Sequence, residues 1–372
     1  EAVVTGTLDI EALRLPVLVG LAGDLTALAG ESDATRIAIS DLRTPPSVSE
    51  GTASDDPGRP GVAVWMLTSG TTGPPKRIDL TYDMLARSVI GADPEQAAAP
   101  TRVRSGIAIV NSPLVHVGGV FRVLLCIAEA RPFVLLRRFD LDLWARAVRE
   151  YRPRAVSLVP AALRMVLHSD LTRADLAGVS AVTSGTAPLS ADDADAFTEK
   201  FGIPVLTSYA ATEFGGGVAG WTLADHRKHW QAKRGSVGRA NPGARLRIVD
   251  ADSGTPLPAD QPGLLEVKPA QLGPDAEWLR TTDIARIDAD GFLFFDGRAD
   301  DMFKVSGATV YPGEVEAALG AVPGVRAAFV ANVGGRVGAA VVCDAPITVA
   351  ELCVAAEAAL SAFKVPTVWK LL

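Results

Sequence analysis

The segment Leu67-Thr-Ser-Gly-Thr-Thr-Gly-Pro-Pro-Lys76 (LTSGTTGPPK) combines two glycines, four hydroxyl side chains and one lysine within ten residues. It follows directly on the apolar run Val62–Leu67, which has the length of a buried strand. Glycines allow backbone N–H groups to converge on an anion, while hydroxyl groups and a lysine bind its remaining oxygens. The segment therefore predicts a phosphate-binding loop at the end of a strand, with a plain surface turn as the alternative.

Apolar runs of strand length alternate with amphipathic segments on both sides of this loop. The predicted strands cover residues 15–21, 62–67, 106–110, 132–136, 155–159 and 181–183, and the predicted helices cover 82–90, 141–151, 161–168 and 191–201. This alternation predicts an α/β fold, with a large N-terminal domain of stacked, mostly parallel sheets and helices over residues 1–298. A change in the sequence pattern near Gly297–Asp301 predicts a small, mobile C-terminal α/β domain over residues 299–372. Its predicted helices cover 312–321 and 349–362, and its predicted strands cover 325–331 and 337–342.

The composition excludes several classes of protein. In a chain of 372 residues, 48% hydrophobic residues suffice for a sizeable core. The net charge of -7 and the lack of a basic run argue against a nucleic-acid or anionic-membrane partner. Three cysteines without a C-x-x-C pair predict buried thiols in a reducing compartment. With no apolar run of membrane-spanning length and no signal-peptide pattern, we expect a cytoplasmic protein.

Five further motifs follow the loop in a fixed order. They are residues 113–119 (PLVHVGG), 184–189 (SGTAPL), 208–213 (SYAATE), 281–285 (TTDIA) and 292–304 (FLFFDGRADDMFK). Several come just after predicted strands, where open α/β sheets bind ligands. Together with LTSGTTGPPK, from about Pro57 to Pro366, they resemble the adenylate-forming superfamily of acyl-CoA synthetases, peptide-synthetase adenylation domains and luciferases, and in particular its short acyl-CoA ligase-like members.

The resemblance implies a two-step reaction in which a carboxylate and ATP give an acyl-adenylate and pyrophosphate, and a thiol then displaces AMP. It assigns the β- and γ-phosphates of ATP to Thr68, Ser69, Gly70, Thr71, Thr72, Gly73 and Lys76. Such a cluster of donors and one cation suits the departure of pyrophosphate. Glu213 would supply a carboxylate oxygen to Mg²⁺, and Thr212 would donate to the α-phosphate. For Glu213, a solvated acid at a strand end is the alternative.

The remaining site residues are assigned by the same resemblance. The backbone of Gly185, Thr186, Ala187 and Pro188 would line the adenine, and Tyr209 would stack on its ring. Asp283 would accept from both ribose hydroxyls beside Arg298, with a helix N-cap as the alternative role of Asp283. His116 would gate the acyl pocket, and a core histidine is its alternative. Asp300 would be the hinge of the small domain, and Lys304 would lie at the interface of the second half-reaction unless it is simply solvated.

The acid and the acceptor are less closely specified. By resemblance, residues 214–221 line the acyl pocket, where Gly215–Gly217 leave room and Phe214 or Trp221 could close it. With no cation in this stretch, we expect a monocarboxylic, largely apolar acid. The predicted cofactors and substrates are ATP, Mg²⁺ and CoA. The alternatives left open are a carrier-protein thiol in place of CoA and a nucleotide-binding homologue with impaired catalysis. A homodimer is also left open.

Three departures from the family pattern are visible. The segment before the phosphate loop is short for the family, and Thr282 stands where a glycine usually precedes the aspartate. The family also places an adenylation lysine in a Gly-Lys loop beyond a Lys-x-Pro element. Lys364-Val-Pro366 matches that element, and we expect the Gly-Lys loop in a tail beyond Leu372.

The assignment of Lys76 predicts a selective effect on ATP. Lys76→Ala should reduce transition-state stabilisation of adenylation by about 2–4 kcal/mol, because a preorganised cation beside the departing pyrophosphate is lost. AMP lacks the β- and γ-phosphates, so its affinity, measured by calorimetry, should change much less. Equal losses of ATP and AMP affinity would instead indicate a general disturbance of the loop.

Overall fold

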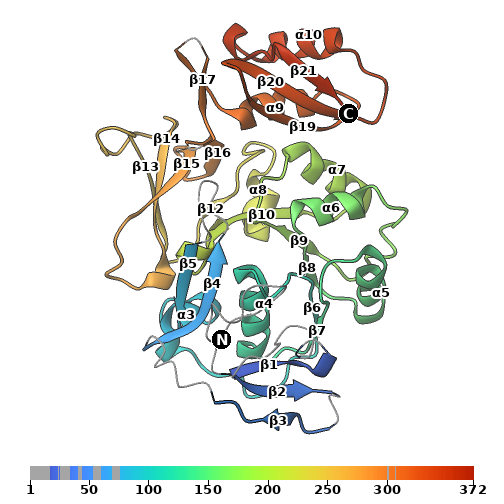
Figure 1. The fold of residues 1–372 in the computed structure, drawn as a ribbon, viewed down its shortest axis with the longest axis vertical. Coiled ribbons are helices and arrows are strands. Elements are labelled where there is room, and N and C mark those ends of the chain that lie inside the picture. Colours follow the sequence, from blue (N-terminus) through green and yellow to red (C-terminus); the bar gives the residue numbers. More distant parts are fainter. Residues whose placement is uncertain are drawn as a thin grey trace. The chain divides into compact units, whose positions relative to one another are not determined.

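The computed structural model describes residues 17–23, 25, 34–40, 44–52, 60–68, 76–299, 301–305 and 307–372, and it is a mixed α/β protein (Figure 1). The chain divides into two compact units. The first comprises Glu1–Asp140, Ala211–Gly216 and Gln271–Gly273, and the second comprises Leu141–Ala210, Gly217–Ala270 and Pro274–Leu372. The predicted domain boundary after residue 298 stays a prediction.

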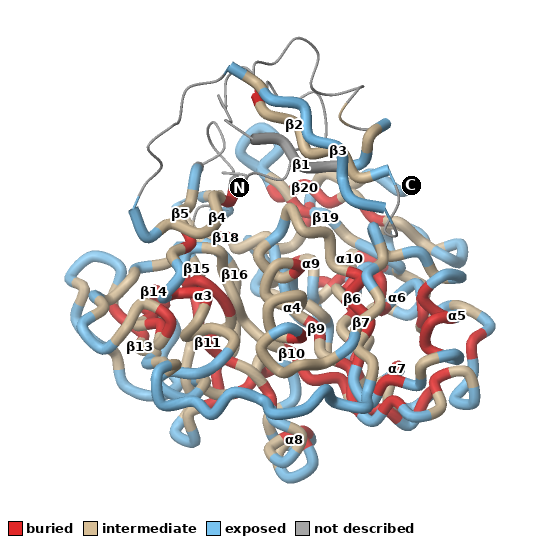
Figure 2. The backbone as a smooth tube through the Cα atoms, turned by 90° about the horizontal axis from the view of Figure 1, so that it is seen from below, coloured by how far each residue is buried: buried red, intermediate tan, exposed pale blue. Residues whose placement is uncertain are grey.

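The described residues of the first unit form three small sheets. They consist of β1 (Val17–Leu21), β2 (Thr35–Ile39) and β3 (Ser47–Ser49), of β4 (Val62–Thr68) and β5 (Lys76–Thr81), and of β6 (Ala108–Val110) and β7 (Phe133–Leu135). The same described residues also include α3 (Tyr82–Val89), the short η1 (Pro94–Gln96) and α4 (Val117–Ala128). Figure 2 shows β3 exposed along its length. The core of this unit gathers around Leu80 and Met84, with Val117 and Val120 of α4 packed against it.

A β-hairpin carries the predicted phosphate loop. Strands β4 and β5 pair antiparallel, and Thr68 and Lys76 form the last pair before the loop. Helix α3 begins immediately after β5, where the Thr81 side chain accepts a hydrogen bond from the Met84 amide (3.1 Å) and satisfies one of the free donors of the first turn. The two ends of the loop are therefore fixed by strand pairing, and β5 is fixed in turn by a capped helix.

The second unit carries a five-stranded sheet with the order β12-β11-β10-β9-β8. These strands are β8 (Ala155–Ser157), β9 (Ala181–Ser184), β10 (Val205–Ala211), β11 (Gly216–Gly220) and β12 (Arg239–Ala240). Helix α5 (Leu141–Tyr151) precedes them, and α6 (Pro160–Leu167), α7 (Ala191–Phe201) and α8 (Leu223–His229) lie between them in the chain. Strands β8, β9 and β10 are parallel. Trp144 and Val148, one helical turn apart, are fully buried on α5, which accounts for the red stretch of that helix in Figure 2.

An antiparallel four-stranded sheet follows in the same unit. Its order is β13 (Arg245–Val249), β14 (Gly263–Lys268), β15 (Leu279–Ile287) and β16 (Leu293–Arg298), and the short η3 (Ala270–Leu272) lies between β14 and β15 in the chain. Glu266 of β14 is 6% exposed and pairs with Arg247 (2.6 Å) and Arg280 (3.0 Å) on its two neighbouring strands. This carboxylate links three strands of the sheet.

Residues Ser236–Gly238, the Ser236 junction, connect the two larger sheets. The buried Ser236 carbonyl accepts hydrogen bonds from Thr207 Oγ1 of β10 (3.2 Å) and from Trp221 Nε1 (2.8 Å). Its hydroxyl donates to the Leu293 carbonyl of β16 (2.8 Å). The Leu293 amide donates to the Gly238 carbonyl (2.9 Å). The junction thus fixes β10 and β16 relative to each other.

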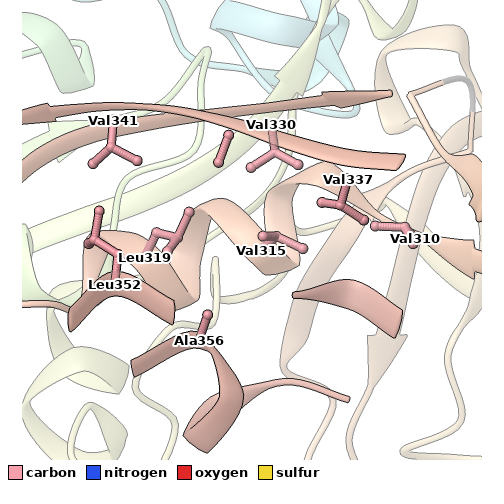
Figure 3. Close-up of a cluster of buried hydrophobic side chains, with 9 residues drawn as sticks. Val310, Val315, Leu319, Val330, Val337, Val341, Leu352 and Ala356 are labelled. Carbon is pink, nitrogen blue, oxygen red and sulfur yellow. The ribbon is translucent and has the colours of Figure 1, made fainter. Parts of the chain in front are cut away.

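The C-terminal part of this unit has its own hydrophobic core. It consists of β17 (Phe303–Val305), β18 (Ala308–Val310), α9 (Pro312–Gly320), β19 (Val325–Val333), β20 (Arg336–Cys343), α10 (Val349–Ala359), η4 (Ala362–Lys364) and β21 (Val368–Leu371). Figure 3 shows Val315 and Leu319 of α9 and Leu352 of α10 facing Val330 and Val341 of the sheet. Lys364 bonds both carboxylate oxygens of Glu314 (2.7 and 2.6 Å), which ties the last turn to the start of α9.

The prediction of mostly parallel sheets is too broad. Parallel pairing holds for β8–β9–β10, β1–β2, β6–β7 and β20–β21, whereas β4–β5, β13–β16 and β19–β20 are antiparallel. A parallel neighbour needs a long crossover such as α7 between β9 and β10, and connections as short as Gly334–Gly335 allow only antiparallel pairing.

The Ser236 junction generates a prediction with a matched control. Gly238 has φ +96°, and a Cβ there would lie 2.1 Å from the Gly220 backbone, whereas Gly235 has φ +85° and open space around it. Gly235→Ala should lower the free energy of unfolding by about 1–2 kcal/mol, the cost of a left-handed L-residue. Gly238→Ala should cost about 3 kcal/mol or more, because backbone must also move. Denaturant unfolding measures both, and equal costs would contradict the close approach.

Candidate functional site

The predicted phosphate loop is only partly within the described residues. Residues 69–75, which include Ser69, Gly70, Thr71, Thr72 and Gly73, lie outside them, as do the side chains of Thr68 and Lys76. Their assignment to the phosphates stays a prediction. What the structure gives is the backbone at the two ends of the loop, the Thr68–Lys76 pair of the hairpin.

Tyr209 and Asp283 meet in the second unit. The Tyr209 hydroxyl of β10 donates a short hydrogen bond to Asp283 Oδ2 of β15, so a residue of the five-stranded sheet contacts one of the four-stranded sheet. The Tyr209 ring packs on Phe295 of β16, with 4.7 Å between centroids and 53° between planes. Burial and the adjacent Asp283 carboxylate raise the pKa of Tyr209, so the phenol stays a proton donor at neutral pH.

A β-bulge brings Arg298 opposite Asp283. Ala285 pairs with Phe295 and Ile284 pairs with Gly297, so Asp296 is an extra residue on β16. In a regular ladder Asp296 would pair with Ile284 and Gly297 with Asp283, whereas the bulge places Arg298 opposite Asp283. Gly297 has φ +148°, which an L-residue rarely adopts, and this accounts for glycine at the bulge. The predicted neighbourhood of Asp283 and Arg298 is therefore present.

The position of Asp283 excludes its alternative role. Asp283 lies inside β15 and not at the start of a helix, so the interpretation as an N-cap is wrong. Its amide donates to Thr281 Oγ1 (3.1 Å), and this hydroxyl donates to the Leu265 carbonyl (2.9 Å). Arg298 Nη2 donates to Thr282 Oγ1 (2.8 Å). The backbone that carries the carboxylate is thus held by its own strand and by β14.

The predicted adenine segment follows β9. Ser184 ends this strand and is buried, whereas Thr186, Ala187 and Pro188 are exposed. Thr186 has φ +72°, a strained value for a β-branched residue and one that often marks a functional segment. The pairing of Leu206 with Thr183 and of Thr207 with Ser184 brings this segment beside β10, which carries Tyr209. Its contact with adenine stays a prediction.

Thr212, Glu213 and His116 belong to the first unit. Thr212 and Glu213 lie in the short helix η2 (Thr212–Phe214) directly after β10, and the Glu213 side chain is exposed. His116 is the exposed residue that precedes α4, so its interpretation as a core histidine is wrong. Neither position tests the predicted roles in phosphate binding or acyl gating. Lys304 is exposed on β17, and the predicted hinge Asp300 lies outside the described residues.

Part of the predicted acyl-pocket segment is closely packed. A Cβ at Gly215 or Gly216 would lie 3.0 Å from Met84 Cε or 2.5 Å from Ser88 Oγ, so these two glycines permit close packing on α3, and the acyl pocket itself stays a prediction. Trp221 is buried against His226, Trp230 and Phe292 and bonded to Ser236, so its ring belongs to a packed aromatic cluster. Spacing alone could not distinguish a lining residue from a core residue.

Two groups that shape the site were not predicted from the sequence. Phe295 supports the Tyr209 ring, and Ser236 fixes the sheets that carry Tyr209 and Asp283. The aromatic run 292–295 was a usable signal for Phe295. Ser236 gave no signal, because a buried serine in a connection has no characteristic spacing.

The predicted Mg²⁺ ligand Glu213 stays a prediction. Among the residues that the structure describes, no group of three or more His, Cys, Asp or Glu side chains is suited to a metal ion. Mg²⁺ in nucleotide sites is commonly held by one or two carboxylates together with substrate phosphates. An exposed Glu213 at the end of β10 fits this pattern.

Within the described residues no helix is long and apolar enough to span a bilayer.

The second unit thus gathers a tyrosine of β10, an aspartate of β15 and an arginine of β16, which offer a nucleotide an aromatic face, an acceptor and a cation. The family model described as AMP-binding enzyme matches residues 18–274. The chain therefore belongs to the AMP-binding enzyme family, and the predicted resemblance to the adenylate-forming superfamily is confirmed.

Curated relatives and solved structures agree with this family. The chain is 32% identical to 4-coumarate–CoA ligase 3 of Oryza sativa subsp. japonica, over 71% of this chain and 51% of the relative. It is 31% identical to 4-coumarate–CoA ligase-like 3 of Arabidopsis thaliana, over 70% and 49%. Thus it spans about half the length of these relatives.

Among solved structures, ATP-bound MatB from Rhodopseudomonas palustris superposes with a TM-score of 0.77 at 26% identity, covering 98% of this chain and 77% of that one. O-succinylbenzoate coenzyme A synthetase (MenE) from Bacillus subtilis, in complex with ATP and magnesium ion, gives 0.77 at 20% identity over the same shares. The latter likeness bears on the fold alone.

The position of Asp283 generates a prediction about the sugar. If its carboxylate accepts from the ribose, ATP should bind more tightly than 2′-deoxy-ATP by about 1–3 kcal/mol, because loss of a hydroxyl leaves an acceptor unpaired. Asp283→Ala should weaken ATP binding and abolish this difference in calorimetry. Asp252→Ala, at an exposed acid of the same unit, should preserve it. Undiminished discrimination in Asp283→Ala would contradict the ribose assignment.

Proposed function

We propose that this chain acts as an AMP-forming acid–thiol ligase, which activates a carboxylic acid as an acyl-adenylate and transfers the acyl group to CoA. The observation that carries the proposal is the Tyr209–Asp283 contact with Arg298 opposite, in a chain of the AMP-binding family. These residues are contributed by β10, β15 and β16 and provide an aromatic face, an acceptor and a cation for a nucleoside.

In the first half-reaction, a carboxylate oxygen of the acid attacks the α-phosphorus of ATP and pyrophosphate leaves. Lys76 and the hydroxyl groups of the loop would bind the departing phosphates, and Thr212 would donate to the α-phosphate. Glu213 would hold Mg²⁺, which would neutralise phosphate charge when bound. Asp283 and Tyr209 would fix the nucleoside, so that the α-phosphate keeps its position during attack.

In the second half-reaction, the CoA thiol attacks the acyl carbonyl and AMP leaves. The proposed acid is monocarboxylic and largely apolar. The curated relatives at 30% identity or more support this choice, because those named above are 4-coumarate–CoA ligases or ligase-like proteins. Gly215 and Gly216 pack closely on α3, so their lack of side chains does not by itself indicate a large acid, and the size of the acid is left to experiment.

The test supplies the chain with ATP, Mg²⁺, CoA and one acid at a time, chosen from 4-coumarate, benzoate, straight-chain monocarboxylates and o-succinylbenzoate. AMP, pyrophosphate and thioester are quantified by mass spectrometry. We expect equal amounts of the three products with an apolar monocarboxylic acid. AMP and pyrophosphate without CoA thioester would favour a carrier-protein thiol. ATP binding without acid-dependent AMP release from any acid would favour a nucleotide-binding homologue.

A further inference from the structure

We propose that the hydroxyl of Tyr209 is a positioning group that orients the Asp283 carboxylate and thereby sets the selectivity of the site for the ribose; this inference rests on the proposed function. Stacking on a base requires only the aromatic ring of Tyr209. The hydroxyl has a separate partner, Asp283 Oδ2, to which it donates directly.

Two independent contacts hold the tyrosine in this position. Its ring lies against Phe295 with 4.7 Å between centroids, and its backbone belongs to β10, which pairs with β9. The Ser236 junction fixes β10 to β16 through Thr207 and Leu293. The Tyr209 hydroxyl that bonds to Asp283 is therefore held in place by a different sheet from the one that carries Asp283.

The contacts of the Asp283 backbone fix its main chain, but they do not fix the orientation of its carboxylate. The amide bond to Thr281 Oγ1 (3.1 Å), the Thr281 bond to Leu265 and the strand pair with Arg298 all constrain the main chain. Rotation about the side-chain torsions is a separate freedom, and the terminal torsion of aspartate is broad. A bond from Tyr209 to Oδ2 restricts this rotation, so the ribose hydroxyls meet a carboxylate whose plane is already set.

The phenol suits this role across the physiological pH range. Burial and the Asp283 charge raise its pKa above the ordinary value, while the Thr281 hydroxyl and the Arg298 charge act in the opposite direction. The phenol thus remains a donor, and a hydrogen bond to an ionised acceptor is among the stronger kinds.

The experiment measures dissociation constants of ATP and 2′-deoxy-ATP for the wild-type chain, Tyr209→Phe, Asp283→Ala and the double variant. Tyr209→Phe keeps the ring and removes only the donor. We expect the ATP affinity of Tyr209→Phe to fall about five- to tenfold. The lost hydrogen bond is to a charged group, but it affects ATP only indirectly, through Asp283. Affinity for 2′-deoxy-ATP, which keeps only the 3′-hydroxyl, should fall by a smaller factor, so discrimination between the sugars shrinks. In the Asp283→Ala background, Tyr209→Phe should change ATP affinity less than about twofold.

Tyr82→Phe provides the matched control, because Tyr82 is 68% exposed and the change is chemically identical. It should leave both constants unchanged. A lower unfolding temperature of Tyr209→Phe with unchanged sugar discrimination would assign the hydroxyl a purely structural role and overturn the inference. Equal effects of Tyr209→Phe with and without Asp283 would also overturn it.

The outcomes separate the two proposals. If the wild-type chain binds ATP and Tyr209→Phe matches it, only the positioning role of Tyr209 fails. If the wild-type chain binds neither nucleotide, the proposed function fails and the inference fails with it. If nucleotide binding behaves as expected but no thioester forms with any acid, the positioning role stands and the ligase reaction does not.

Discussion

The Ser236 carbonyl accepts hydrogen bonds from Thr207 and Trp221, while the hydroxyl of the same residue donates to Leu293. One buried serine thereby links β10 of the five-stranded sheet with β16 of the four-stranded sheet. The candidate nucleoside site depends on this link, because Tyr209 is carried by the first sheet and Asp283 by the second. A shift of either sheet by a fraction of an ångström would alter a hydrogen bond whose distance range is narrow.

The bulge in β16 is the second constraint on the site. In a regular ladder, alternation would place Gly297 opposite Asp283, and no cation would stand beside the carboxylate. The extra residue Asp296 changes the pairing by one, and Arg298 takes that place. Burial raises the pKa of Asp296, which is consistent with an acid held at an irregular point of a sheet edge and not in open solvent. Bulges of this kind often redirect a side chain next to a functional site.

The agreement between sequence and structure varies with the kind of signal. The sequence predicts helices α5 and α7 with the bounds that the structure gives, because their amphipathic spacing is regular. The structure adds that α7 has a Ser190 N-cap and a left-handed Gly202 C-cap. Helix α4 is not predicted from the sequence, since Val117–Ala128 is almost wholly apolar, with Arg122 as its one charged residue. Strand β5 is not predicted from the sequence. Its alternating sequence Lys-Arg-Ile-Asp-Leu-Thr begins at Lys76, which the sequence assigns to the phosphate-binding loop.

The sequence by itself determined the family, because the family is defined by motifs and their order along the chain, and both can be read without the structure. These motifs are LTSGTTGPPK, SGTAPL, YAATE, TTD and GRADDMFK. It also named Tyr209, Asp283 and Arg298 as site residues. Only the tertiary structure decided that Tyr209 donates to Asp283, that Asp283 lies within a strand and that Trp221 is packed in the core. These facts depend on strand register, on a one-residue bulge and on contacts between residues up to 74 positions apart. Local propensity and spacing carry no information about such contacts, since they are fixed when separate sheets pack against each other.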